Sequence, residues 1–206
     1  MGMRSEAFDF LSNLNTLWAI ILGAVLATAG GLAAFFIEGW IERHRRERSA
    51  ALFFGETLCT LQIILEFAAD ARGIGDPYGP VTMRMLRFAR REIEIYERNR
   101  ENLFWLNDVA LRARIHTLVL RLTMPLEGIF DTSREISELE FRLKSLPQSD
   151  PAAREELARD IAQLRERRDE GFGFVMETTK LLKAPIDALE PLAHQSFSTL
   201  VTVARQ

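Results

Sequence analysis

The sequence is poor in the residues on which metal and redox chemistry depend. Its 206 residues include one cysteine, Cys59, and three histidines, His44, His116 and His194. A single thiol excludes an intrachain disulfide and a thiolate metal cluster. The histidines lie on separate segments and lack the Glu-x-x-His pairs that hold metals in helical bundles, and no phosphate-binding loop motif is present. We therefore expect a protein that is not an enzyme and that has no metal and no cofactor.

Basic residues show no excess. The chain has 26 Lys and Arg against 29 Asp and Glu, a net charge of −3 and an isoelectric point near 5.7. Nucleic-acid-binding domains usually gather a basic excess on one face. Arg90, Glu94 and Arg98 follow each other at four-residue spacing, a pattern typical of a solvated helix face. We expect no nucleic-acid partner, and no small-molecule substrate is evident.

Charge is missing altogether from a long stretch near the amino end. No charged residue occurs between Asp9 and Glu38, and most residues from 14 to 37 are apolar. A helix of this length rises roughly 36 Å, against about 30 Å for the hydrocarbon core of a bilayer. Residues 14–37 are therefore predicted to form a single transmembrane helix, preceded by a short extracytoplasmic segment at 1–13.

The flanking charges predict the orientation of this helix. A basic collar at 38–49 follows it and contains Arg43, Arg45, Arg46 and Arg48. By the positive-inside rule, the amino terminus lies outside and the carboxyl-terminal body lies in the cytoplasm. The basic residues are 23 Arg to 3 Lys, which we interpret as the codon bias of a GC-rich bacterium, so the expected location is a bacterial inner membrane.

Two readings of the apolar stretch remain open. Ala27-Thr28-Ala29 matches a signal-peptidase site, although the leader is acidic and the apolar residues continue to Ile37, which favours an anchor over a cleaved export signal. Small residues recur at every fourth position, a spacing that lets two membrane helices approach closely, but Gly and Ala are common in any membrane helix. This candidate packing face consists of Ala19, Gly23, Ala27 and Gly31.

Heptad spacing predicts that the rest of the chain folds as helical hairpins. The apolar stripe in 50–69 would suit a second membrane span, but Glu56 and Glu66 make a helix buried in protein the better prediction. A Gly- and Pro-rich turn at 72–80 and a helix at 81–106 complete the first hairpin. At 106–108 the sequence allows either a continuous helix or a new one capped by Asn107 or Asp108.

The second predicted hairpin, at 108–183, contains a candidate hinge. Asp150-Pro151 is a good start for its second helix. Its register places Pro125 opposite Gly171, close to Gly173, so two weak helical segments coincide. The alternative is that both helices simply bend together to pack. A closing helix at 185–204 is predicted to follow.

The expected fold is thus all-α. One amino-terminal transmembrane helix continues into a cytoplasmic antiparallel helical bundle of about four to five helices with coiled-coil-like hairpins at 50–106 and 108–183. Such an architecture suggests a non-catalytic interaction or scaffold protein that associates with itself or with a partner membrane helix. The alternative function is a regulatory or sensory subunit of a membrane transport or signalling complex.

Overall fold

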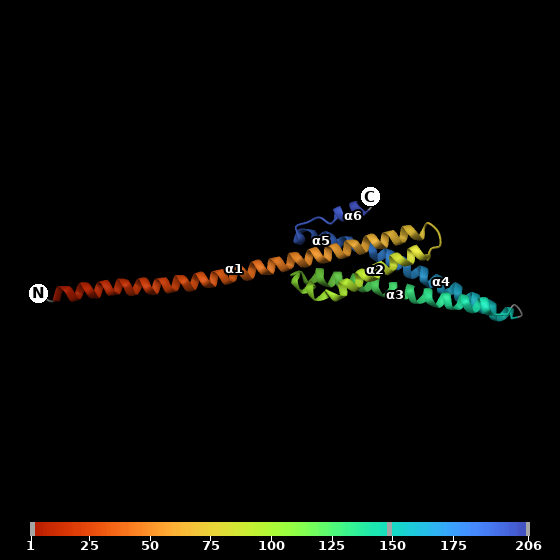
Figure 1. The fold of residues 1–206 in the computed structure, drawn as a ribbon, viewed down its shortest axis with the longest axis horizontal. Coiled ribbons are helices and arrows are strands. Elements are labelled where there is room, and N and C mark those ends of the chain that lie inside the picture. Colours follow the sequence, from red (N-terminus) through yellow and green to blue (C-terminus); the bar gives the residue numbers. More distant parts are fainter. Residues whose placement is uncertain (1–2, 148–149, 205–206) are drawn as a thin grey trace. The chain divides into compact units, whose positions relative to one another are not determined.

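The computed structural model describes residues 3–147 and 150–204, with side chains at Trp18 and from Ile21 onward except Val201 and Ala204. These residues form helices and no strand, which confirms the predicted all-α class. The elements are α1 (Met3–Arg72), α2 (Pro80–Arg98), the 3-10 helix η1 (Arg100–Trp105), α3 (Val109–Ser145), α4 (Pro151–Lys180), α5 (Lys183–Ala193) and α6 (Ser198–Ala204) (Figure 1). Internal contacts divide the chain into two units, Met1–Arg46 and Glu47–Gln206.

The helix α1 has very different surroundings along its 70 residues. In the amino-terminal unit its large apolar side chains, including Leu22, Leu26 and Phe35, are exposed by 42–72%. In the carboxyl-terminal unit the predicted stripe is at most 1% exposed and consists of Ala51, Phe54, Leu58, Leu61, Leu65 and Ala68. The prediction that 50–69 is buried in protein is therefore confirmed. Among the described helices, α1 alone is long and apolar enough to span a membrane.

The core of the carboxyl-terminal unit is assembled around this buried stripe. It gathers side chains from α1 through α5 together with Phe197, and the rings of Phe54 and Tyr96 meet edge to face with centroids 5.8 Å apart. The neighbouring helices α3 and α4 carry a second, smaller cluster toward the turn that joins them. That cluster consists of Ile136, Ile161 and Leu164.

Several element boundaries differ from prediction. The helix expected at 81–106 ends at Arg98 and is followed by η1, and Asp108 then caps α3 by accepting the N–H groups of Ala110 and Leu111. Residues 106–108 are therefore a turn. The closing helix expected at 185–204 is divided into α5 and α6, because His194 adopts a left-handed conformation that ends α5.

Two local predictions are confirmed. The Asp150 carboxylate accepts the Ala153 N–H, and Pro151 occupies the first position of α4. Pro125 lies within α3, which continues from Val109 to Ser145, so the proline does not end the helix. Sequence signals at the helix ends therefore predicted the long antiparallel pair of α3 and α4.

Gly55 provides a notch in α1 that holds the carboxyl-terminal segment. The ring of Phe197 packs directly against it and is 1% exposed, and a Cβ atom at position 55 would overlap that ring. The Glu190 carboxylate holds the segment in place by accepting the Phe197 N–H at 2.8 Å and the Ser196 hydroxyl at 2.8 Å. Gly55 therefore has a packing role, although it lies in the interior of a helix.

We predict opposite effects for the same substitution at two helical glycines. Gly55→Ala should lower the free energy of unfolding by about 1–3 kcal/mol, because the buried Phe197 ring has no space to move into. Gly128→Ala, where no side chain or other segment lies within 4 Å, should raise it by up to about 1 kcal/mol. Denaturant unfolding of the full chain in detergent micelles, followed by circular dichroism, measures both values. A G55A variant as stable as G128A would contradict the notch.

Candidate functional site

The predicted packing face lies on a part of α1 that no other described segment covers. Beyond the helix's own backbone, a Cβ atom at Gly23 or Gly31 would have no described neighbour within 4 Å, and Ala27 is exposed. Ala19 lies among the residues whose side chains are not described. Thr28, beside this face, donates its hydroxyl to the Ala24 carbonyl at 2.8 Å, so its polar group is satisfied within the helix. The described members of the face, Gly23, Ala27 and Gly31, are thus small and uncovered by any other described segment.

The four collar arginines have different surroundings. Arg43 and Arg45 are exposed, and Arg46 pairs with Glu42 one turn away, with 2.7 Å between Nε and Oε1. Arg48 instead donates from Nε to the Ala193 carbonyl at 3.3 Å, at the carboxyl end of α5. Arg48 therefore has a structural partner within the carboxyl-terminal unit, which its place in the basic collar did not suggest.

The candidate hinge residues Pro125 and Gly171 are neighbours in the structure. A Cβ atom at Gly171 would lie 3.9 Å from the Pro125 carbonyl oxygen and 3.5 Å from Cγ1 of Ile129. The register predicted for this pair is therefore present. Gly173 lies at an exposed position with open space where a side chain would stand. Motion about these residues stays a prediction.

A network of aromatic and charged groups lies next to this pair. The Asp169 carboxylate accepts from Arg72 at 2.7 Å and from the Tyr78 hydroxyl at 2.8 Å. The Arg168 guanidinium carbon lies 3.7 Å from the centroid of the Tyr78 ring, and that of Arg72 lies 4.5 Å from the Phe172 centroid. The network joins the end of α1, the loop after it and the middle of α4.

Arg168 is the least satisfied member of this network. Its Nη1 lies 3.3 Å from the Ser133 hydroxyl, whereas its Nε is buried without a hydrogen-bond partner among the described residues. Burial lowers the pKa of Arg168, opposed by the nearby Tyr78 and Asp169. Heptad spacing put Arg168 on the apolar stripe of α4 but gave no sign of Tyr78, which comes from a loop 90 residues earlier. The network restrains the α4 segment that precedes Gly171.

Cys59, His44 and His194 are side chains of kinds often used in catalysis, and each has a structural role here. Cys59 is buried, and desolvation raises the pKa of its thiol, which keeps it protonated and weakly nucleophilic. The His44 ring stacks on Trp40 with centroids 4.6 Å apart, and His194 ends α5. Within the described ranges, no group of three or more His, Cys, Asp and Glu side chains is placed to hold a metal ion.

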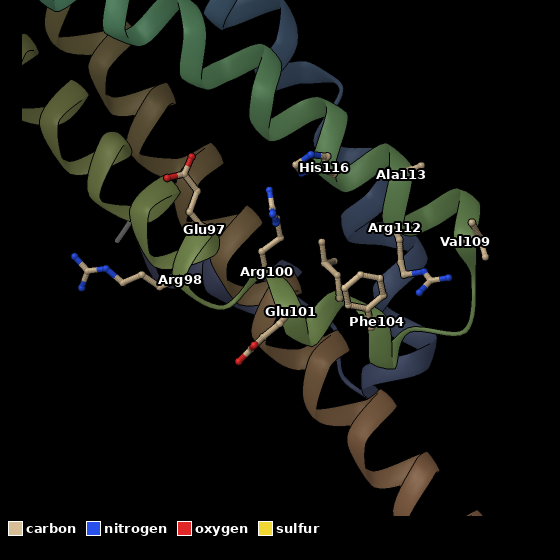
Figure 2. A pocket seen from close by; sticks show the side chains of 10 residues that line it. Glu97, Arg98, Arg100, Glu101, Phe104, Val109, Arg112, Ala113 and His116 are labelled. Atoms are coloured by element: carbon tan, nitrogen blue, oxygen red, sulfur yellow. The ribbon is translucent and has the colours of Figure 1, made fainter.

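A pocket of about 720 Å³ opens where α2, η1 and α3 meet (Figure 2). Apolar and charged side chains both line it. They are Glu97, Arg98, Arg100, Glu101, Leu103, Phe104, Val109, Arg112, Ala113 and His116. His116 Nδ1 also lies 3.2 Å from the hydroxyl of the buried Tyr96. No motif in the sequence pointed to this pocket, because its walls come from three elements whose ends the heptad pattern did not locate.

Comparison with family models, with curated proteins and with solved structures gave no match for this chain. Its function is therefore inferred from its own residues. Three features stand out: the uncovered apolar stretch of α1, the braced Pro125–Gly171 pair, and the pocket beside η1 with its unusual mixture of arginines and exposed apolar groups.

The chain has two tyrosines, and we predict that neither ionises near the usual pH of 10 in the folded protein. Burial raises the pKa of Tyr96 to about 12, with Glu97 adding to the effect and Arg100 opposing it. Burial and the hydrogen bond to Asp169 raise that of Tyr78 as well. The resulting stabilisation is complete below pH 10 and is lost as the pH rises toward 12.

Phenolate absorbance in a pH titration of Tyr78→Phe isolates Tyr96. Its midpoint should lie near 12 in the folded variant and near 10 after unfolding in denaturant. A midpoint of 10 before denaturant is added would show that Tyr96 is solvated rather than buried against the core.

Proposed function

We propose that this protein is a single-pass membrane protein of a bacterial inner membrane, with a cytoplasmic helical bundle that acts as a non-catalytic interaction or scaffold module. The observation that carries the proposal is the contrast along α1. Its apolar stripe is fully buried from Ala51 to Ala68, whereas its apolar side chains between Trp18 and Ile41 are exposed. One helix with two such apolar stretches requires a second apolar environment besides the protein core.

A bilayer supplies that environment. Eleven large apolar side chains from Trp18 to Ile41 are each exposed by 42–72%. Leaving each of them in water forgoes on the order of 1 kcal/mol. The total is comparable to the entire net stability of a typical domain, about 5–15 kcal/mol. Immersion in lipid removes this cost without any further protein contact.

The ends of the apolar stretch suit the two interfaces of a membrane. Trp18 and Trp40 are both exposed, and the 22 residue steps along the helix from one to the other amount to about 33 Å. Tryptophan favours the headgroup level on both sides of a hydrocarbon core about 30 Å thick. Arg43, Arg45 and Arg46 follow Trp40 and support a cytoplasmic location for the carboxyl-terminal body.

Self-association through the small-residue face is the mode of interaction that we propose. In lipid, helices associate through close backbone packing rather than through exclusion of water, so small side chains favour contact. Gly23, Ala27 and Gly31 offer such a surface. A regulatory or sensory subunit is the second candidate, favoured by the contact of Pro125 with Gly171. The two differ in whether a stoichiometric membrane partner copurifies.

We predict that the membrane topology can be read with single cysteines. In a Cys59→Ala background, Ser5→Cys should react with a membrane-impermeant maleimide in intact spheroplasts. Ser137→Cys, at an exposed position of α3, should react only after lysis. Both variants should stay in the membrane pellet after alkaline carbonate extraction. Labelling of Ser137→Cys in intact spheroplasts would reverse the proposed orientation, and a shortened soluble product would indicate a cleaved signal instead of an anchor.

We also predict that association depends on one face of the anchor. Gly23→Ile with Ala27→Ile should reduce a two-hybrid signal for transmembrane association to background, because the added side chains separate the two backbones. Ala29→Ile with Ala33→Ile enlarges two small residues about 120° around the helix from Gly23 and Ala27 and should leave most of the signal. An equal loss in both double variants would count against this face, and no loss in either would rule out association through it.

A further inference from the structure

The turn between η1 and α3 presents apolar side chains to solvent beside arginines. Phe104 is 77% exposed and Val109 is 65% exposed, although both border the pocket. The Arg112 guanidinium carbon lies 5.6 Å from the centroid of the Phe104 ring. In Figure 2, Arg100 extends toward the side of the pocket where His116 lies, and Arg112 lies beside Phe104. We call these residues, Arg100, Phe104, Val109 and Arg112, the turn surface.

The two arginines of the turn surface have no carboxylate partner within ion-pair distance among the described residues. Arg100 and Arg112 take part in no ion pair among the described residues, whereas Arg72, Arg90 and Arg165 each have a carboxylate partner. Two acids also line the pocket, but the Glu101 side chain extends outward from it in Figure 2. An anion at the turn surface would therefore meet guanidinium groups that form no ion pair among the described residues, with Glu97 as the other acid of the pocket.

The turn surface belongs to a rigid part of the carboxyl-terminal unit. Leu103 and Leu106 are buried in the core on either side of Phe104, and the Asn107 N–H donates to the Glu47 carboxylate at 3.1 Å. Glu47 follows Ile37 by ten residues, which reach at most about 36 Å even when fully extended. If residues 14–37 span the bilayer, the turn surface is tied to the segment of chain that leaves the membrane.

We infer that the turn surface and its pocket bind the headgroup of an anionic phospholipid of the membrane in which the chain is anchored. Guanidinium groups bind phosphate oxygens through paired hydrogen bonds, a role that suits Arg100 and Arg112. Phe104 and Val109 would contact the glycerol and upper acyl region, where exposed apolar side chains are stabilised. A soluble anion would explain the arginines but not the exposed Phe104. This inference rests on the proposed anchoring.

Lipid contact can be measured at Trp105, which directly follows Phe104. Trp18→Phe with Trp40→Phe leaves Trp105 as the single tryptophan of the full chain. In nanodiscs, brominated phosphatidylglycerol should quench its fluorescence several-fold more than the same fraction of brominated phosphatidylcholine. In this background, Arg100→Gln with Arg112→Gln should remove most of that excess, because each arginine near a membrane surface contributes about a fivefold preference for anionic lipid.

Matched controls separate the site from general charge and hydrophobicity. Arg142→Gln with Arg159→Gln makes the same charge change at exposed positions near the α3–α4 turn and should leave the excess unchanged. Phe104→Ala should lower quenching by both lipids, whereas Phe141→Ala, which removes a ring that is 74% exposed, should not. Equal quenching by the two lipids, or equal effects of the paired variants, would overturn the inference.

Failure of the site and failure of the anchor give different results. Trp40→Phe with Trp105→Phe leaves Trp18 as the reporter, which lies in the proposed membrane span. Quenching of Trp18 by brominated phosphatidylcholine without quenching of Trp105 by either lipid would reject the lipid site and keep the anchor. Absence of quenching at both tryptophans would reject the membrane location and the lipid site together.

Discussion

The structure depends on how the apolar side chains of α1 are removed from water. From Ala51 to Ala68 they form the centre of a protein core, with exposures of 1% or less, whereas from Trp18 to Ile41 the described chain leaves them uncovered. The free energy gained by removing apolar surface from water is roughly proportional to the area removed, whether protein or lipid covers that area. The same helix can therefore belong to a folded unit at one end and to a lipid phase at the other. The remaining elements pack against the end that belongs to the folded unit.

The carboxyl-terminal unit holds its own part of α1, from Glu47 to Arg72, by contacts at several points. Arg48 caps α5, Gly55 receives Phe197, and Arg72 pairs with Asp169 of α4. These contacts come from residues far apart in the chain, so the ends of α1 within this unit are both tied to the carboxyl-terminal helices.

Most side chains of the kinds often used in catalysis have a structural role in this molecule. Cys59 is buried, His44 and His194 have structural surroundings, and His116 borders the pocket beside η1. That pocket combines arginines with exposed apolar side chains, a combination suited to an amphipathic anion better than to bond-making chemistry. We propose an interaction protein that contacts lipid at two places, its anchor and the turn surface, as the account that joins these observations.

Sequence alone determined the features that neighbouring residues encode. Heptad spacing identified the buried stripe of α1, Asp150-Pro151 marked the start of α4, and the absence of charge defined the apolar stretch at 14–37. The register of the predicted hairpin also placed Pro125 beside Gly171. Such signals are local or periodic, so they can be recognised in the sequence without knowledge of the fold.

Only the tertiary structure decided where α2 ends, why Gly55 is a glycine, how Tyr78 meets Arg168, and that Arg100 and Arg112 border one pocket. Helix ends can yield to core packing, as at η1, where burial of Leu103 and Leu106 accompanies a tighter 3-10 turn. The other contacts join residues from separate elements. They follow from the simultaneous packing of several helices, which no single stretch of sequence specifies.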